Sequence, residues 1–290
     1  MLWLSPEACL LPRCPEPANA LFWSDPLRDL LSMHKNKTWA QCRMEAAFMY
    51  DPDFDNRLWL SSVPLVRLND QGLPTGIASG CLIDYSRKRL LLTAAHATGD
   101  QGNWAIMLRF VPGQGTANYK LGTMNFLARG SLAQPGLTKI DLSYVEVPPS
   151  VIAHRQEIEM ATGAVKSESP ITVHTLSWAD EPQHDETYGF CGMVMPVREA
   201  HFGQTFHTGV LRISSGLTFL RTEGDYHYFR LPSQHPGHEH FEGCSGAPVL
   251  SNTGKIVGLL CGGCESTNEV WAISFQSYKL AIDILVGNVR

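Results

Sequence analysis

From Val63 onward, apolar and polar positions alternate in short runs that are separated by turn residues. The run Val63–Leu68 shows this alternation, and the turn signal Asn69–Gly72 follows it. A period of two residues predicts a strand with one buried face. The first half of the chain has such runs at 63–68, 76–84, 89–96, 104–110, 119–127 and 142–147. About six strands are enough to close one small barrel, so we predict an all-β first half.

The second half repeats the pattern, and Pro148-Pro149-Ser150 separates the two halves. Its candidate strands are 171–178, 187–195, 208–213, 217–221, 226–231, 247–250, 255–261 and 270–275. We predict a first barrel at 59–147, a crossing linker at 148–168, and a second barrel with a closing segment at 169–290. That closing segment, Ser277–Val286, has apolar residues at 280, 281, 284 and 285, the spacing of a helix.

Residues 1–58 lack the strand pattern, and we interpret them as an N-terminal extension. Prolines at 6, 12, 15, 17 and 26 predict an irregular first part. Asp25–Pro26 is a helix-start signal, and Thr38–Met49 predicts a second helix. The extension either packs against the barrels or serves as a regulatory or removable pro-segment.

Composition excludes several classes of partner. The net charge of −5 gives no electrostatic basis for binding nucleic acid or an anionic membrane. No apolar run approaches the ~20 residues that span a bilayer. The first residues lack the basic segment of a secretion signal, so we expect a cytoplasmic protein.

The stretch Phe241–Leu250 contains a serine, Ser245, with a glycine after it and another two residues before it. A serine hydroxyl becomes a strong nucleophile only when a base takes its proton and donors stabilise the developing oxyanion. The two glycines allow a sharp bend, so the N–H groups of Gly243 and Ser245 could point at one spot beside Oγ. A simple Gly-Ser-Gly turn is the structural alternative.

Two other stretches supply partners for this serine. Arg89–His96 is an apolar strand that ends in Thr-Ala-Ala-His, and Ile140–Val147 opens with Asp141. Together with the Gly-x-Ser-Gly-x-Pro pattern at Ser245, they resemble the motifs of the chymotrypsin-like serine proteases. The order His, Asp, Ser also matches that family. The resemblance covers residues 60 to 285.

This resemblance implies an all-β fold of two six-stranded antiparallel Greek-key barrels of the chymotrypsin type, with a C-terminal helix. It implies a serine endopeptidase that needs no cofactor and acts on proteins or peptides through an acyl-enzyme. His96 would be the base, Asp141 the residue that orients it, and Ser245 the nucleophile. The segment Gly76–Asp84 is similar to a strand of HtrA-like proteases. Asp180 and Asp185 are less well placed rivals of Asp141.

The cysteines fit reduced thiols better than disulfides. In secreted members of the family, the position of Cys81 pairs with the residue after the histidine, which is Ala97 here. A further usual half-cystine is Phe241 here, so we expect a reducing, cytoplasmic compartment. Cys244 competes with Ser245 as nucleophile. It also takes the place of the aspartate that pairs with a freed N-terminus in zymogens, so trypsinogen-type activation is not expected.

Specificity residues follow from the same resemblance. The segment Leu259–Gly263 would offer an edge on which a peptide adds as an antiparallel strand. Its members Cys261, Gly262 and Gly263 would bind substrate, with the glycines leaving the pocket entrance open. Glu239 resembles a pocket-floor acid that selects Arg or Lys.

Three histidines crowd the loop that contains Glu239, namely His235, His238 and His240. They would favour acidic or amide side chains, bind a metal, or belong to a polar surface loop. Cys261-Gly-Gly-Cys264 could be a zinc or redox pair but lacks a second such pair.

Two other functions stay open. The chain could be a latent protease, switched on by cleavage within residues 1–55 or by a regulatory partner. It could also be a non-catalytic scaffold that keeps the fold to bind peptides.

Overall fold

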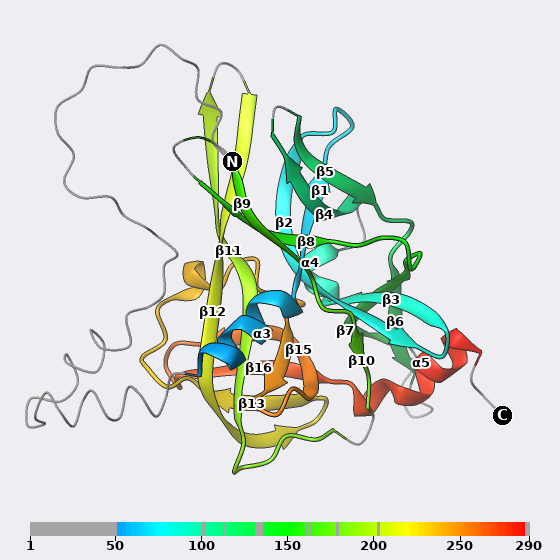
Figure 1. Ribbon diagram of the computed structural model, residues 1–290. Coiled ribbons are helices and arrows are strands. Elements are labelled where there is room, and N and C mark those ends of the chain that lie inside the picture. Colours follow the sequence, from blue (N-terminus) through cyan, green and yellow to red (C-terminus); the bar gives the residue numbers. More distant parts are fainter. Residues whose placement is uncertain are drawn as a thin grey trace, which may run out of the picture.

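The computed structural model describes residues 51–99, 102–112, 114–130, 136–159, 162, 164–177, 180–201 and 204–287. Within this part of the chain, two β-structures lie side by side (Figure 1). The helices that the sequence predicts at 25–31 and 38–49 lie outside the described residues, so they stay predictions.

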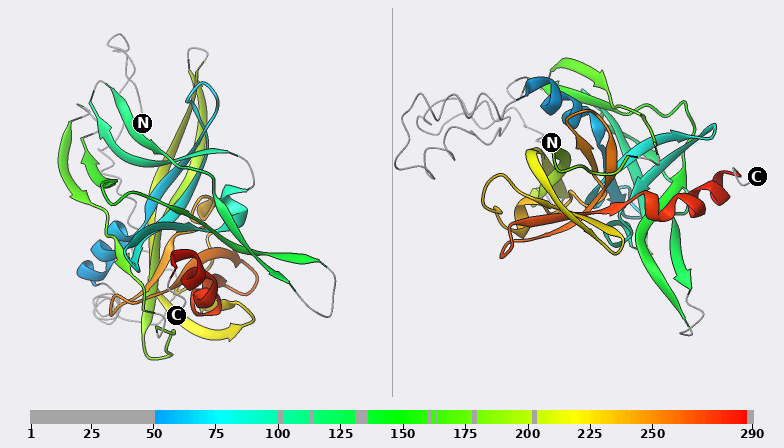
Figure 2. Two further views of the ribbon diagram at one scale, coloured as in Figure 1. Left: turned by 90° about the vertical axis from the view of Figure 1, so that its right-hand side faces the viewer. Right: turned by 90° about the horizontal axis from the view of Figure 1, so that it is seen from below.

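The first β-structure is a sheet with the hydrogen-bonded order β5-β4-β1-β2-β3-β7-β6. Its strands are β1 (Val63–Leu68), β2 (Pro74–Tyr85), β3 (Lys88–Thr93), β4 (Asn103–Val111), β5 (Gly115–Lys120), β6 (Asn125–Gly130) and β7 (Leu137–Glu146). The single strand predicted at 119–127 is two strands here, because the chain leaves the sheet between them. β5 and β6 are the edge strands in this order, whereas we predicted a closed six-stranded barrel. The β6–β7 hairpin extends away from the body of the molecule (Figure 2).

The second β-structure is a closed barrel with the order β11-β12-β13-β16-β15-β14. Its strands are β11 (Thr187–His201), β12 (Gln204–Glu223), β13 (Tyr226–Arg230), β14 (Pro248–Ser251), β15 (Ile256–Cys264) and β16 (Glu269–Ser274). The predicted strands at 208–213 and 217–221 are parts of β12. Tyr188, Phe190 and Phe229 are fully buried inside the barrel. The predicted six-stranded second barrel is therefore confirmed.

The segment between the two β-structures contains a hairpin and a short bridging strand. β8 (His154–Ile158) and β9 (Val165–Pro170) pair with each other in the region predicted as a linker. β10 (His174–Thr175) pairs in parallel with β2. The run 171–178, which we expected in the second barrel, therefore contributes to the first sheet instead.

Helix α3 (Pro52–Ser61) precedes β1 and packs on the second barrel. The side chain of Asp51 accepts hydrogen bonds from Asp53 N–H and Phe54 N–H, and proline occupies the first helical position. Phe54 and Leu58 are buried. A Cβ at Gly189 of β11 would lie 2.5 Å from Leu58 Cδ1, so the absence of a side chain there makes room for the helix. The predicted boundary between the N-terminal extension and the first barrel, at residue 58, therefore falls inside α3.

A common apolar core joins the two β-structures. It combines Leu92 and Leu142 of the first sheet with Leu259 and Ile273 of the barrel. The C-terminal helix α5 (Lys279–Val286) adds Ile282 and Val286, as its helical spacing predicted. The other helical elements are α4 (Ala95–Thr98), η1 (His238–His240) and η2 (Gln276–Tyr278). None of the helices within the described residues is long and apolar enough to cross a membrane.

Candidate active site

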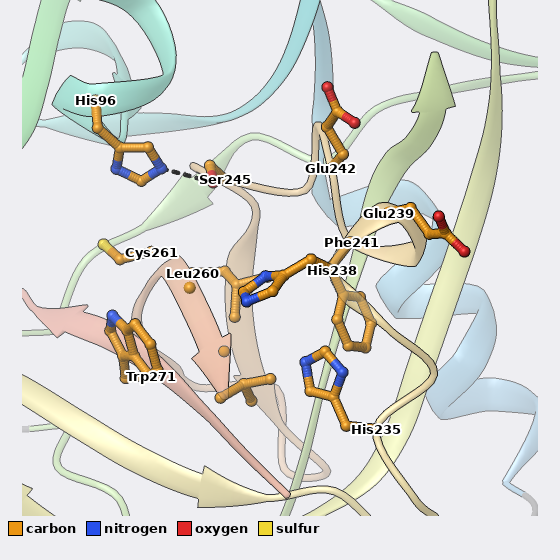
Figure 3. A pocket seen from close by; sticks show the side chains of 13 residues that line it. His96, His235, His238, Glu239, Phe241, Glu242, Ser245, Leu260, Cys261 and Trp271 are labelled. Atoms are coloured by element: carbon orange, nitrogen blue, oxygen red, sulfur yellow. Dashed lines mark hydrogen bonds between the residues drawn. The ribbon is translucent and has the colours of Figure 1, made fainter. Parts of the chain in front are cut away.

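The histidine, aspartate and serine selected from the sequence lie in one hydrogen-bonded row. Nε2 of His96 is 2.8 Å from Oγ of Ser245 (Figure 3). Its Nδ1 is 2.7 Å and 2.9 Å from the two carboxylate oxygens of Asp141. The backbone N–H of His96 also donates to this carboxylate, at 2.8 Å. A carboxylate at Nδ1 favours the tautomer with the proton there, so the Nε2 lone pair faces the serine hydroxyl.

Strand pairing explains why His96 and Asp141 meet. Thr93, the last residue of β3, pairs with Ser143 of β7. Asp141 lies two residues before Ser143, and α4 carries His96 past the end of β3 toward it. Oγ1 of Thr98 in α4 is 3.1 Å from Oγ of Ser143, which ties the short helix to β7. The two catalytic candidates are therefore held by adjacent strands of one sheet.

Asp141 is ionised at neutral pH. Its side chain is 20% exposed. Burial alone would raise the pKa of this carboxyl, but the hydrogen bonds from the ring and backbone of His96 and the attraction to that ring lower it. The thiol of Cys261 lowers it further. The net pKa lies below the usual value, so Asp141 can stabilise a positive imidazolium on His96.

Ser245 follows a tight turn that depends on glycine. The N–H of Cys244 donates to the carbonyl of Phe241 at 3.0 Å. Gly243, the third residue of that turn, has φ +93°, as a type II turn requires. At Gly246, which has φ +90°, a Cβ would lie 2.2 Å from both the carbonyl of Ser79 and Oγ1 of Thr93. A Cβ at Gly243 would lie 2.4 Å from the carbonyl oxygen of Met193, so both glycines are required for conformation and for space.

Ser79 of β2 fixes the turn from the first sheet, a role that the sequence interpretation missed. Its Oγ donates to the carbonyl of Gly243 at 2.9 Å and accepts from the N–H of Met193 at 3.2 Å. Its backbone N–H donates to the carbonyl of Ser245 at 3.1 Å. Within the described residues, the N–H groups of Gly243 and Ser245 donate to no other group, so both remain free to bind an oxyanion.

A pocket of about 770 Å³ opens beside His96 and Ser245 (Figure 3). It is lined further by His235, His238, Glu239, Phe241, Glu242, Leu260, Cys261, Gly262, Gly263, Val270 and Trp271. Glu239 does not form its floor: the side chain is 82% exposed, and the carboxylate points away from the pocket in Figure 3. His240 is absent from the lining, because its Nδ1 faces Nη1 of Arg212 at 3.2 Å.

The glycines predicted at the pocket entrance pair with β16, Gly262 with Trp271 and Gly263 with Val270. A Cβ at Gly262 would lie 2.6 Å from Cζ2 of Trp271, so the indole ring covers this glycine. Trp271 therefore forms one wall of the pocket entrance at Gly262. We did not predict this contact from the sequence. Because the contact depends on the register of β15 and β16, it has no local sequence signal.

No family model matches the sequence, and no curated protein matches it either. Solved structures do match. GrC superposes with a TM-score of 0.50 at 11% identity, over 82% of this chain and 97% of the other. A mutant of human heparin binding protein (CAP37) gives a TM-score of 0.50 at 13% identity, over 83% and 96% of the two chains. The serine endoprotease of Yersinia pestis gives 0.49 at 11% identity, over 82% and 68%.

The chain has the chymotrypsin fold. The fold class predicted from the sequence is thereby confirmed. At these identities the likeness concerns the fold alone, so the chemistry depends on the residues of the site.

Cys244 is not available as a nucleophile in this chymotrypsin fold. Its side chain is fully buried in the core of the second barrel, where a Cβ at Gly192 would lie 2.6 Å from its Sγ. Burial raises the pKa of the Cys244 thiol, and burial also raises the pKa of Cys261. The cysteine that competed with Ser245 in the sequence therefore remains a neutral core residue.

One edge of β15 faces the site. β14 pairs with β15 only at residues 256–259, whereas β16 pairs with it along residues 258–264. Leu260 is also bound on the side away from β16, because its N–H donates to the carbonyl of Ala247 and its carbonyl accepts from the N–H of Gly246, each at 2.8 Å. Beyond residue 260, this side of β15 has no strand partner within the described part of the chain. Of the predicted segment Leu259–Gly263, only the part Cys261–Gly263 thus offers the kind of edge that β-addition of a peptide needs.

The described cysteines and histidines form neither disulfides nor a metal site. Cys81, Cys191, Cys244, Cys261 and Cys264 are free thiols. Over the same ranges, no group of three or more His, Cys, Asp or Glu side chains is arranged to hold a metal ion. His235, His238 and His240 accordingly do not converge on one point.

Proposed function

We propose that the chain is a serine endopeptidase that hydrolyses peptide bonds of protein or peptide substrates without a cofactor. The observation that carries the proposal is the 2.8 Å contact between Nε2 of His96 and Oγ of Ser245, in a ring whose Nδ1 is held by Asp141 at 2.7 Å. A nucleophile, its base and an orienting carboxylate within hydrogen-bond reach make up a triad for acyl transfer.

In the first half-reaction, Oγ of Ser245 attacks the carbonyl carbon of the scissile bond while His96 Nε2 takes the hydroxyl proton. The carbonyl oxygen becomes an oxyanion, which the N–H groups of Gly243 and Ser245 stabilise. The C–N bond then breaks, and the proton on His96 passes to the leaving amine. In the second half-reaction, water loses a proton to His96 and attacks the acyl-enzyme, releasing the acid and restoring Ser245.

The free edge of β15 supports an extended substrate that runs antiparallel to Cys261–Gly263. Main-chain hydrogen bonds would bring the scissile carbonyl to Ser245, and the preceding side chain would enter the pocket below it. We also propose a cytoplasmic location, since all five described cysteines are free thiols and reduced thiols are typical of that compartment.

Intact mass after treatment with a fluorophosphonate probe tests the proposal. We expect one adduct on the wild-type chain and none on Ser245→Ala, because only a serine activated by a base reacts readily with this probe. Cys244→Ser is a matched control next to the nucleophile, and it should keep the adduct. An unlabelled wild-type chain would contradict constitutive activity and favour the latent or scaffold alternatives.

A further inference from the structure

His235 is a pocket residue whose side chain has an unused polar atom. It is 6% exposed and lines the pocket beside Ser245. Its Nδ1 accepts the backbone N–H of Gly237 at 3.1 Å. Its Nε2 is buried and has no hydrogen-bond partner within the described residues. Buried polar atoms are nearly always paired, so an unpaired one in a pocket wall indicates a missing ligand group.

The chemistry of this free atom can be deduced from the other nitrogen. Burial lowers the pKa of the His235 imidazole, so the ring is neutral at neutral pH. A neutral imidazole carries one proton, and Nδ1 must keep its lone pair to accept from Gly237. The proton is therefore on Nε2, and the pocket presents a hydrogen-bond donor.

Packing holds this donor in place. The ring of Phe241 meets the ring of His235 edge-on, with centroids 5.0 Å apart and planes at 86°. A Cβ at Gly263 would lie 2.9 Å from Nε2, so a side chain at 263 would crowd this atom. In Figure 3, His235 lies at the end of the pocket away from Ser245. A substrate side chain must therefore extend along the pocket to reach it.

The charges around His235 offset each other. Glu265 accepts the N–H of His238 at 3.0 Å, and Nη1 of Arg212 is 3.2 Å from Nδ1 of His240. Glu265 raises the pKa of His235, whereas Arg212, His238 and His240 lower it. Among these groups Arg212 has a permanent positive charge and Glu265 a negative one, so the pocket has no surplus of permanent positive charge to compensate a buried carboxylate. A basic side chain fits no better, since Lys and Arg bring only donors to a donor.

We propose that His235 determines specificity, and that the substrate residue before the cleaved bond (P1) is glutamine, whose side-chain carbonyl accepts the Nε2–H of His235. A carboxamide supplies the acceptor without a charge, and glutamine is the longer of the two carboxamide side chains. This inference rests on the proposed peptidase function. It replaces the preference for Arg or Lys that the sequence position of Glu239 predicted.

The test uses peptides that differ only at P1, with Gln, Glu, Asn, Arg or Leu, and measures kcat/KM for each. We expect Gln to be best. In His235→Phe, which keeps the ring and removes the donor, the ratio of Gln to Leu should fall about 10- to 100-fold. His184→Phe, the same change at a histidine outside the pocket lining, is the matched control and should leave that ratio unchanged. A best substrate with Arg, Glu or Leu, or an unchanged ratio in His235→Phe, would overturn the inference.

Fluorophosphonate labelling separates this failure from failure of the proposed function, because the probe has no P1 side chain. Labelled wild-type and His235→Phe chains with the wrong P1 preference would refute only the role of His235. If the wild-type chain is not labelled, product peptides ending in Gln, Glu or Arg can be titrated into Ser245→Ala by calorimetry. Weaker binding of the Gln peptide than of the others would then refute the inference by itself.

Discussion

Asp141 connects the proposed chemistry with the stability of the fold. Two donors of His96, the ring Nδ1 and the backbone N–H, approach its carboxylate within 2.9 Å. Both interactions favour the ionised carboxyl and outweigh the effect of burial. Since the folded protein holds the pKa below the value of 3.8 for an unperturbed aspartate, the unfolded chain binds this proton more readily.

The contribution of Asp141 to stability should therefore depend on pH with a defined sign. It is fully present above about pH 4, where the unfolded carboxyl is ionised, and is lost as the pH falls through the folded pKa. Urea unfolding of wild type and Asp141→Asn between pH 7 and pH 3 measures it. We expect the wild-type advantage to shrink in acid, and a difference that is constant with pH would contradict this account.

The same variant should lower kcat about 10³- to 10⁴-fold, because asparagine cannot hold the His96 ring in the productive tautomer. Asp84→Asn is a suitable control, since Asp84 also pairs with a base, Arg89 at 2.8 Å, but lies outside the site.

Sequence motifs predicted the three residues of the proposed triad, which the structure brings into hydrogen-bond contact, because each belongs to a short local pattern. They did not predict Ser79 or Trp271 as residues of the site, and they did not single out His235 from the other two histidines of its loop. The contact of Ser79 with Gly243 spans 164 positions. The position of the His235 ring, and with it the unpaired Nε2, depends on the hydrogen bond from Gly237 and on the close approach of Gly263. Such roles depend on the assembled fold and not on neighbouring residues.

At the scale of elements, β2 supports the turn that carries Ser245. One buried serine on this strand binds the carbonyl of Gly243 and the N–H of Met193 through Oγ. In secreted zymogens of the family that the sequence resembles, an aspartate at the position of Cys244 pairs with a new N-terminus. The buried thiol here makes no such pair, so the turn is held from β2 without a charge.

Ser79→Ala should therefore lower kcat about tenfold and leave KM nearly unchanged. The backbone pairing of Ser79 with Ser245 would remain, but the carbonyl of Gly243 would lose its donor and the oxyanion donors their fixed position. Ser62→Ala is a matched control, because Ser62 is equally buried and its Oγ has no partner within the described residues. A change in KM alone would assign Ser79 to substrate binding instead.

Element boundaries show where pattern reasoning succeeds and fails. β1 and the helix near the C-terminus match their predicted ranges, since their periodicity is strong. The two strands predicted at 208–213 and 217–221 are one strand, in which Gly216 has φ +79° and is skipped in the pairing of β11 with β12, as in a bulge. α3 starts at Asp51–Pro52 with the same helix-start signal, an aspartate before a proline, that predicts a helix at Asp25–Pro26. We did not predict α3 from the sequence.

At the scale of the whole molecule, α3 is part of the folded unit and not a detachable extension. Leu58 is fully buried against the second barrel. Leu58→Ala should lower the free energy of unfolding by about 2–5 kcal/mol, from lost burial and the cavity left behind. Leu280→Ala is the control: this leucine of α5 is 69% exposed, so its loss should change stability by less than about 0.5 kcal/mol. Thermal or urea unfolding measures both, and equal effects would contradict the packing of α3.

The packing of α3 also determines which truncated chain can test whether the N-terminal residues inhibit the proposed protease. A truncation near Asn56 would remove the cap residue Asp51 and the buried Phe54, and would unfold α3. A chain that begins at Asp51 leaves the helix complete, so its hydrolysis rate can be compared with that of the full chain. Equal rates would exclude inhibition by the first 50 residues, whereas a faster truncated chain would establish it.

The bridging strand β10 has a consequence for synthesis on the ribosome. Its two residues complete the edge of β2 although they follow the whole first sheet in the chain. In turn, α3 emerges early but its binding surface on β11 emerges more than a hundred residues later. Neither half can therefore finish folding while the nascent chain is incomplete, and apolar surface of the first half stays uncovered during translation. We expect nascent chains that stop before β10 to bind chaperones, and release to coincide with emergence of the second barrel.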